Sequence, residues 1–168
     1  MPSQGEKPPV RVLTQVKREY ARKFRVTPLK EMAARIVAGE LPGRAAAIGL
    51  IFTDDETLQR LNRDYRAIDL PTDVLSFPMQ DVEGESVFIT APEEVPQLGD
   101  VIISLPRAVE QSGEYGATLE EELARLVAHG VLHILGYDHE AEHDAARMRE
   151  KEEAALASLP PRSQTTSL

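Results

Sequence analysis

The sequence lacks cysteine, and it lacks any long apolar run. Without cysteine there is no disulfide bond and no thiolate ligand, so a metal site in this chain must use His, Asp, Glu or water. The longest purely apolar run apart from glycine, residues 45–52, is far too short to cross a bilayer. The first ten residues also lack the apolar core of a signal peptide. We therefore expect no membrane segment and a cytoplasmic location.

Length and composition are those of one soluble domain. The chain has 168 residues, of which 42% are hydrophobic and 28% charged, as in an ordinary globular protein. We expect a single domain over residues 9–157, with disordered ends at residues 1–8 and 158–168.

The net charge of −9 argues against a nucleic-acid partner, but the charge is unevenly distributed. Residues 1–50 hold ten Lys and Arg against four Glu, a net of +6, whereas the rest of the chain has a net of −15. A basic segment, residues 17–25 (KREYARKFR), carries most of the positive charge together with two aromatic residues. Such a segment can follow phosphates and stack a base, or it can simply be a solvated surface. The candidate RNA-binding residues here are Lys17, Arg18, Arg22 and Lys23.

All four histidines lie between residues 129 and 143, in a stretch that begins HGVLHILGYDH. Residues four apart on a helix share a face, so His129 and His133 can bind one ion. Gly136 can end that helix and let the chain bring in His139 as a third ligand. Three imidazoles with an open fourth position are typical of catalytic zinc. His143 is either a substitute ligand or an exposed helix residue.

The residue after the first histidine is Gly130, where zinc peptidases with this ligand spacing have a glutamate that takes a proton from water. Glycine cannot move a proton, so a peptidase would need another base. A small residue at this position also allows a neighbouring element to approach the helix closely.

The pattern along the chain predicts an α+β fold with one small mixed sheet of about four strands, about five helices, and the metal site on a C-terminal helix. Strands are expected at residues 10–13, 45–53, 74–77 and 100–104, with a short one at 87–90 inside a surface excursion over residues 80–98. Helices are expected at residues 28–38, 55–66, 106–115, 119–135 and 140–156. Thr27, Asp54 and Thr118 are the expected N-caps, Thr118 in a capping box with Glu121. Leu58, Leu61 and Tyr65 are expected to face the core.

Two further blocks support a family assignment. Residues 61–66 (LNRDYR) and 71–78 (PTDVLSFP), followed by GDVIIS at 99–104, resemble the YbeY family, bacterial zinc-dependent endoribonucleases and ribosomal RNA maturation factors, as does the histidine run. The resemblance covers most of residues 45–140. It implies cleavage of single-stranded RNA during maturation of small-subunit ribosomal RNA and in ribosome quality control. It also implies ribosomal proteins or an assembly GTPase as partners.

The predicted mechanism combines Zn²⁺ with a cation. Zinc held by three imidazoles lowers the pKa of its water toward about 7 and polarises a phosphoryl oxygen. Arg66 stands where the family has its functional arginine, and a guanidinium would stabilise the charge that develops during phosphodiester cleavage. The alternative for Arg66 is an ion pair with Asp64 or Asp69.

Two other residues have open roles. Asp138 either accepts a hydrogen bond from a ligand histidine or caps a turn, and Ser76 either binds substrate or packs at a strand end. Three functions remain open: the endoribonuclease, a non-catalytic ribosome-assembly or RNA-binding factor with a structural metal, and a zinc peptidase.

Overall fold

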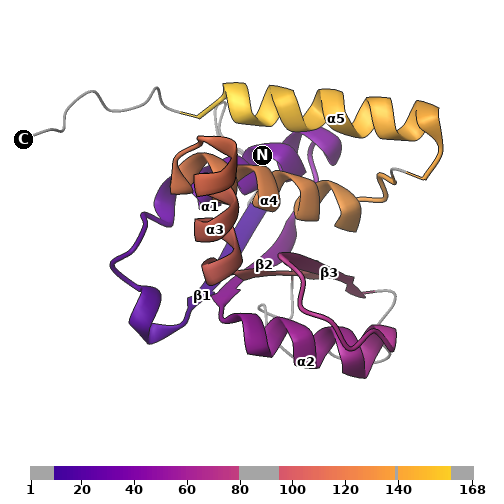
Figure 1. The fold of residues 1–168 in the computed structure, drawn as a ribbon. Coiled ribbons are helices and arrows are strands. Elements are labelled where there is room, and N and C mark those ends of the chain that lie inside the picture. The colour runs from indigo at the N-terminus through magenta and orange to yellow at the C-terminus, as the bar shows by residue number, and fades with distance from the viewer. Residues whose placement is uncertain (1–9, 80–94, 139, 160–168) are drawn as a thin grey trace, which may run out of the picture.

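The fold is a four-stranded sheet with helices on both faces (Figure 1). The computed structural model describes residues 10–79, 95–138 and 140–159. The sheet order is β1-β2-β4-β3, formed by β1 (Val10–Val16), β2 (Ala46–Thr53), β3 (Val74–Pro78) and β4 (Gln97–Ser104). Strands β1, β2 and β4 are parallel, and β3 pairs antiparallel with β4 at the edge opposite β1. The predicted mixed sheet and α+β class are confirmed.

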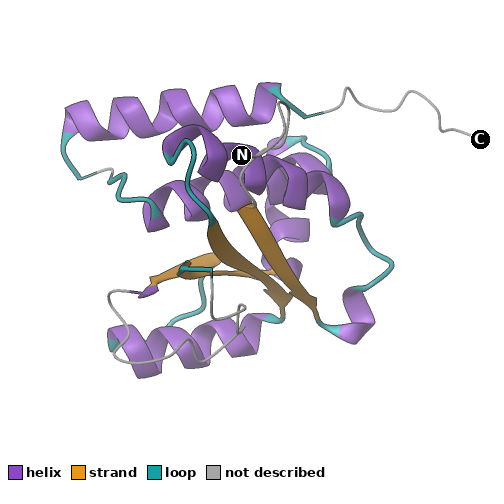
Figure 2. Ribbon diagram, turned by 180° about the vertical axis from the view of Figure 1, so that it is seen from behind, coloured by secondary structure: helices purple, strands orange, loops and turns teal. Residues whose placement is uncertain are grey.

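Five α-helices surround this sheet: α1 (Thr27–Glu40), α2 (Asp55–Arg66), α3 (Leu105–Tyr115), α4 (Leu119–Ile134) and α5 (Glu142–Ala157), with a short 3-10 turn η1 (Arg18–Tyr20) after β1. Helix α2 covers one face of the sheet, whereas α1, α3 and α4 lie on the other side, with α5 against α4 (Figure 2). None of the described helices is long and apolar enough to span a membrane.

The core has two parts because side chains alternate along each strand. Val101 and Ile103 of β4 point into the larger cluster, with residues of α1 and α4. Ile102 between them joins a smaller cluster beneath α2, with Leu58 and Leu61. Helix α4 is mostly buried along its length, so it is a rigid support for any site built on it.

Local signals in the sequence explain where the helices begin and end. Asp54 Oδ1 accepts a hydrogen bond from the Thr57 backbone N–H at 2.7 Å and caps α2, as expected. The predicted capping box at the start of α4 is present, with both reciprocal bonds. At the other end Gly136 has φ +102°, and the N–H groups of residues 136 and 137 donate to the carbonyls of His133 and Leu132. This is a Schellman ending, so the role expected for Gly136 is confirmed.

Some local expectations were wrong. The N-cap of α1 is Val26, without a side-chain cap, because Thr27 is already helical. Tyr65 is 48% exposed rather than core. Strand β4 begins at Gln97, inside the predicted excursion. The strand expected at 87–90 lies outside the described residues, as do the N-terminal residues 1–9 and the last nine residues. Leu159, just past the predicted domain end, packs against the core.

Candidate active site

The two described histidines of the run lie on one face of α4, as their spacing predicted. Their ring centroids are 6.1 Å apart, with planes inclined by 62°, and both side chains are half-buried. An open hollow of about 250 Å³ adjoins His129. It is lined by His129, Ala145, Met148, Arg149 and Glu152. The histidine face of an otherwise buried helix therefore reaches the surface.

Each of these rings is held through its Nδ1 atom. His129 Nδ1 lies 2.7 Å from Oε1 of Glu152 on α5, and His133 Nδ1 lies 3.1 Å from the carbonyl oxygen of Tyr137. Acceptors of this kind fix the tautomer of a metal-binding histidine and leave Nε2 as the ligand atom. The donor chemistry thus fits a zinc ion. Sequence reasoning missed Glu152, because nothing in the pattern distinguishes it from the other acidic residues of α5.

The third predicted ligand, His139, lies outside the described residues. Within residues 10–79, 95–138 and 140–159, no group of three His, Asp or Glu side chains is placed to hold a metal. Asp138 Oδ1 accepts from the Glu140 backbone N–H at 3.2 Å, which is the turn-capping alternative. His143 is exposed on α5. The three-histidine site therefore stays a prediction.

The loop that leads to His139 is anchored to two helices. The Tyr137 hydroxyl donates to Glu40 of α1 at 2.5 Å, and the guanidinium of Arg147 on α5 lies 5.6 Å from the centre of the Tyr137 ring. The hydrogen bond to Glu40 raises the pKa of Tyr137. The chain directly after α4 is thus fixed on both sides.

Gly130 is needed for packing. A Cβ atom there would lie 2.5 Å from Cγ1 of Val101 and 3.3 Å from Oγ of Ser76, so only glycine lets this turn of α4 sit against the sheet. The Ser76 hydroxyl is buried and donates to the Gly130 carbonyl at 3.2 Å. This contact favours the packing alternative for Ser76 over substrate binding.

Arg66, the last residue of α2, reaches the same strand. Its guanidinium donates to the Ser76 carbonyl at 2.7 Å and lies 5.6 Å from the centre of the Phe77 ring. Among the described residues it forms no ion pair with a carboxylate: Asp64 pairs with Arg63, and Asp69 accepts from Gln59. The alternative role expected for Arg66, an ion pair with Asp64 or Asp69, is therefore absent from the described residues.

These contacts join three elements. Ser76 accepts from Arg66 through its carbonyl and donates to Gly130 through its hydroxyl. Gly130 is the neighbour of His129 on α4. Arg66 of α2 and the turn of α4 that carries His129, more than 60 residues apart in sequence, are thus linked through a single residue of β3.

The basic segment lies elsewhere. It follows β1, at the opposite edge of the sheet from β3, and η1 and the end of α4 lie at opposite ends of the molecule in Figure 1. Phe24 is buried against Phe52, with ring centroids 4.8 Å apart, so it cannot stack a base. The four predicted RNA-binding residues are all exposed: Lys17, Arg18, Arg22 and Lys23. The structure does not bring this segment to the histidines.

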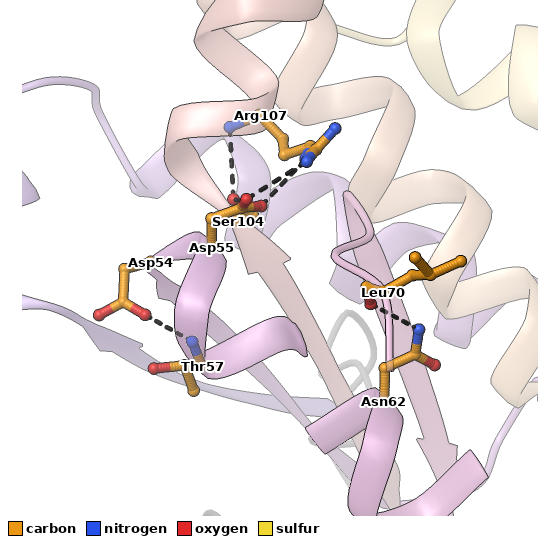
Figure 3. Close-up of polar contacts among 7 residues, drawn as sticks. All are labelled: Asp54, Asp55, Thr57, Asn62, Leu70, Ser104 and Arg107. Atoms are coloured by element: carbon orange, nitrogen blue, oxygen red, sulfur yellow. Dashed lines mark hydrogen bonds and ion pairs between the residues drawn. The ribbon is translucent and has the colours of Figure 1, made fainter. Parts of the chain in front are cut away.

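Charges near the start of α2 are paired within the fold. Lys17 Nζ lies 2.6 Å from Asp54 and 3.0 Å from Glu19. Burial raises the pKa of Asp54, but the hydrogen bonds from Lys17 and Thr57 outweigh it and hold that pKa at about 2. Next to it, Arg107 binds both carboxylate oxygens of Asp55 (Figure 3). Lys17 thus acts first as an anchor between β1 and α2.

Comparisons with known proteins show which family the chain belongs to. The family model described as Endoribonuclease YbeY matches residues 14–160. The Endoribonuclease YbeY of Pelotomaculum thermopropionicum is 49% identical over 131 residues, which cover 78% of this chain and 84% of that protein. The one from Chloroflexus aurantiacus is 46% identical over 132 residues, with the same two shares. The solution structure of TM1509 from Thermotoga maritima has a TM-score of 0.55 and 27% identity, over 88% of this chain and 86% of that one. This chain belongs to the YbeY endoribonuclease family.

Proposed function

We propose that this protein is a zinc-dependent endoribonuclease that cleaves single-stranded RNA during maturation of small-subunit ribosomal RNA, in the cytoplasm. Family membership supports the endoribonuclease activity. The observation that carries the proposal is the link from Arg66 through Ser76 to Gly130, the residue next to His129 on α4. A guanidinium that no described carboxylate neutralises, linked to the helix that carries oriented imidazoles, suits a reaction at a phosphodiester.

The zinc would be held by His129, His133 and His139. A zinc ion there supplies a Lewis acid for a phosphoryl oxygen and activates water. Glu152 and the Tyr137 carbonyl hold the first two rings in place. Because these acceptors lie on α5 and on the loop after α4, the ligand rings are oriented before a metal binds.

Arg66 would stabilise the transition state. Negative charge accumulates on phosphoryl oxygens as the bond breaks, and a fixed cation binds that charge more strongly than it binds the ground state. The Ser76 carbonyl and the Phe77 ring hold the guanidinium in place. Only part of its hydrogen-bonding capacity is used by this contact, since a guanidinium has five N–H donors.

The two alternative functions, a non-catalytic assembly factor with a structural metal and a zinc peptidase, are less well supported. A structural metal is not required to hold α4, because the helix has a capping box at one end, a Schellman ending at the other, and a buried apolar face. A peptidase needs a base near the metal, and the carboxylate beside His129 is Glu152, which is used to hold the ring. Ribosome quality control and the partners, ribosomal proteins or an assembly GTPase, belong to the same proposal and rest on the family alone.

The test is cleavage of a single-stranded ribosomal RNA fragment by the wild type and by His133→Ala, purified side by side. A third protein, His143→Ala, is the control, because that histidine is exposed on α5. All three are stripped of metal and then given zinc. We expect cleavage by the zinc-loaded wild type and by the control, and none by His133→Ala. Equal cleavage by all three, or by none, would reject the proposal.

A further inference from the structure

A cluster of exposed apolar side chains adjoins Arg66. Five large hydrophobic side chains are exposed in the described part of the chain, and three of them lie within six residues. These are Tyr65, Ile68 and Leu70, at 48%, 46% and 62% exposure, and we call them the α2 loop patch. Apolar groups concentrated on a surface, rather than scattered singly, indicate a binding function.

The loop that carries the patch is fixed to the last turn of α2. Asn62 is buried and donates from Nδ2 to the Leu70 carbonyl at 3.0 Å (Figure 3). The Ile68 backbone N–H donates to the Asn62 carbonyl at 3.2 Å. Both contacts come from one residue of the helix, so the patch keeps its shape without a ligand. A pre-formed surface loses less entropy when it binds.

Tyr65 and Arg66 both lie against one aromatic ring, that of Phe77. The Tyr65 and Phe77 rings meet edge to face, with centroids 5.4 Å apart, and the Arg66 guanidinium lies 5.6 Å from the same Phe77 centroid. An exposed aromatic ring and a cation therefore sit next to each other. Single-stranded nucleic acid offers the complementary pair in every nucleotide, a base with a π-face and a phosphate.

We propose that the α2 loop patch is a platform on which one unpaired base of the RNA stacks against Tyr65, while Arg66 contacts the neighbouring phosphate. The inference rests on the proposed function and adds a reason for single-strand preference. Bases in a duplex are already stacked and paired, so presenting one to Tyr65 costs unstacking energy. An unpaired base has no such cost.

An RNA base suits this surface better than a protein partner. The apolar area consists of three side chains interrupted by Arg66 and Asp69, whereas stable protein interfaces bury about 800 Å² on each partner. The cation beside the ring also matches a phosphate. We therefore assign an RNA base as the occupant of the α2 loop patch. Docking of a protein there is one of the outcomes that would contradict this proposal.

The experiment measures single-turnover cleavage by the full zinc-loaded protein. The substrates are short single-stranded RNA oligonucleotides in which each base in turn is replaced by an abasic position. The proteins are the wild type, Tyr65→Leu, Tyr65→Phe and Tyr115→Leu. Tyr115 is the matched control, since it is an exposed tyrosine on α3, and thermal unfolding checks that every variant is folded.

We expect Tyr65→Leu to raise the half-saturating protein concentration about 5- to 150-fold, the usual range for loss of base stacking on an aromatic ring. Tyr65→Phe and Tyr115→Leu should match the wild type. In the wild type one abasic position should raise the half-saturating concentration, and in Tyr65→Leu that position should have no further effect.

Two results would overturn the platform. One is a Tyr65→Leu protein with wild-type cleavage and an unchanged abasic profile, which would assign the patch to another partner such as a protein. The other is an equal loss on every oligonucleotide, which would mean a structural role. Failure of the proposed function is distinguishable, because the wild type itself would then not cleave.

Discussion

The two edges of the sheet both carry cations, but they use them differently. Near the β1 edge Lys17 is neutralised by Asp54 and Glu19. At the β3 edge Arg66 is held by a carbonyl and a ring, and no described carboxylate pairs with it. A cation that is neutralised within the fold stabilises structure. A cation held by neutral groups keeps its charge for a ligand, and here Ser76 links it to α4, the helix that carries His129 and His133.

The largest effect is expected from removing Arg66, the cation of the β3 edge with which no described carboxylate pairs. Arg66→Ala should lower cleavage of single-stranded RNA by about 10²–10³-fold, or about 2.7–4 kcal/mol, as for loss of one charge-stabilising donor. Zinc affinity should not change, because Arg66 contacts Ser76 and Phe77 rather than a histidine. Arg63→Ala is the matched control, since this exposed arginine of the same helix pairs with Asp64. Wild-type cleavage by Arg66→Ala would remove the residue from the mechanism.

Glu152 extends the comparison to carboxylates. Asp54 pairs with a lysine and stabilises the fold, whereas Glu152 contacts a predicted zinc ligand, His129. Glu152→Ala should weaken zinc binding by about 10- to 100-fold, the usual effect of losing an acceptor behind a ligand histidine. Metal titration of the stripped protein measures it. The control is Glu153→Ala, at an exposed neighbour on α5. The same zinc affinity in both variants would show that the contact with His129 does not support the site.

Gly130 tests whether the histidine turn must lie against the sheet. Gly130→Ala should lower the free energy of unfolding by about 1–3 kcal/mol, because the added Cβ would overlap Val101. Gly113→Ala is the matched control in α3, where a Cβ meets nothing within 4 Å, and it should be neutral or stabilising by up to about 1 kcal/mol. Denaturant titration gives both values. If the two substitutions had the same effect, the tight packing of α4 would be disproved.

The basic segment should show the smallest effect, and only on long RNA. Neutralising Arg18, Arg22 and Lys23 together should lower the slope of log affinity against log salt by about 2, at roughly 0.7 for each single-strand phosphate contact. An oligonucleotide too short to reach from the β3 edge should show no change. Lys17→Met should leave the slope unaltered, because its charge is paired with Asp54. An unchanged slope on long RNA would exclude the segment as an RNA contact.

Much of the fold could be read from the sequence because its signals are local. Asp54, Thr118 and Gly136 define helix ends through contacts within four residues, and the apolar run of β2 predicted a buried strand. Tyr65 was misjudged because a helical pattern does not show where the packed face of the sheet ends.

The site was only partly predictable for the same reason. The i, i+4 spacing of His129 and His133 puts them on one helix face whatever surrounds them. Glu152 and the Ser76 link depend on tertiary packing between elements that are distant in sequence. Gly130, a glycine inside the helix that carries His129 and His133, was the one sign in the sequence that α4 lies unusually close to its neighbour.

The most direct test of the account is a zinc titration of the metal-stripped protein in which bound zinc and cleavage of single-stranded RNA are measured in the same samples. We expect cleavage to rise in proportion to occupancy and to level off when each chain holds one ion. Cleavage that is independent of occupancy, or full occupancy without cleavage, would contradict a metal-dependent ribonuclease centre at the β3 edge.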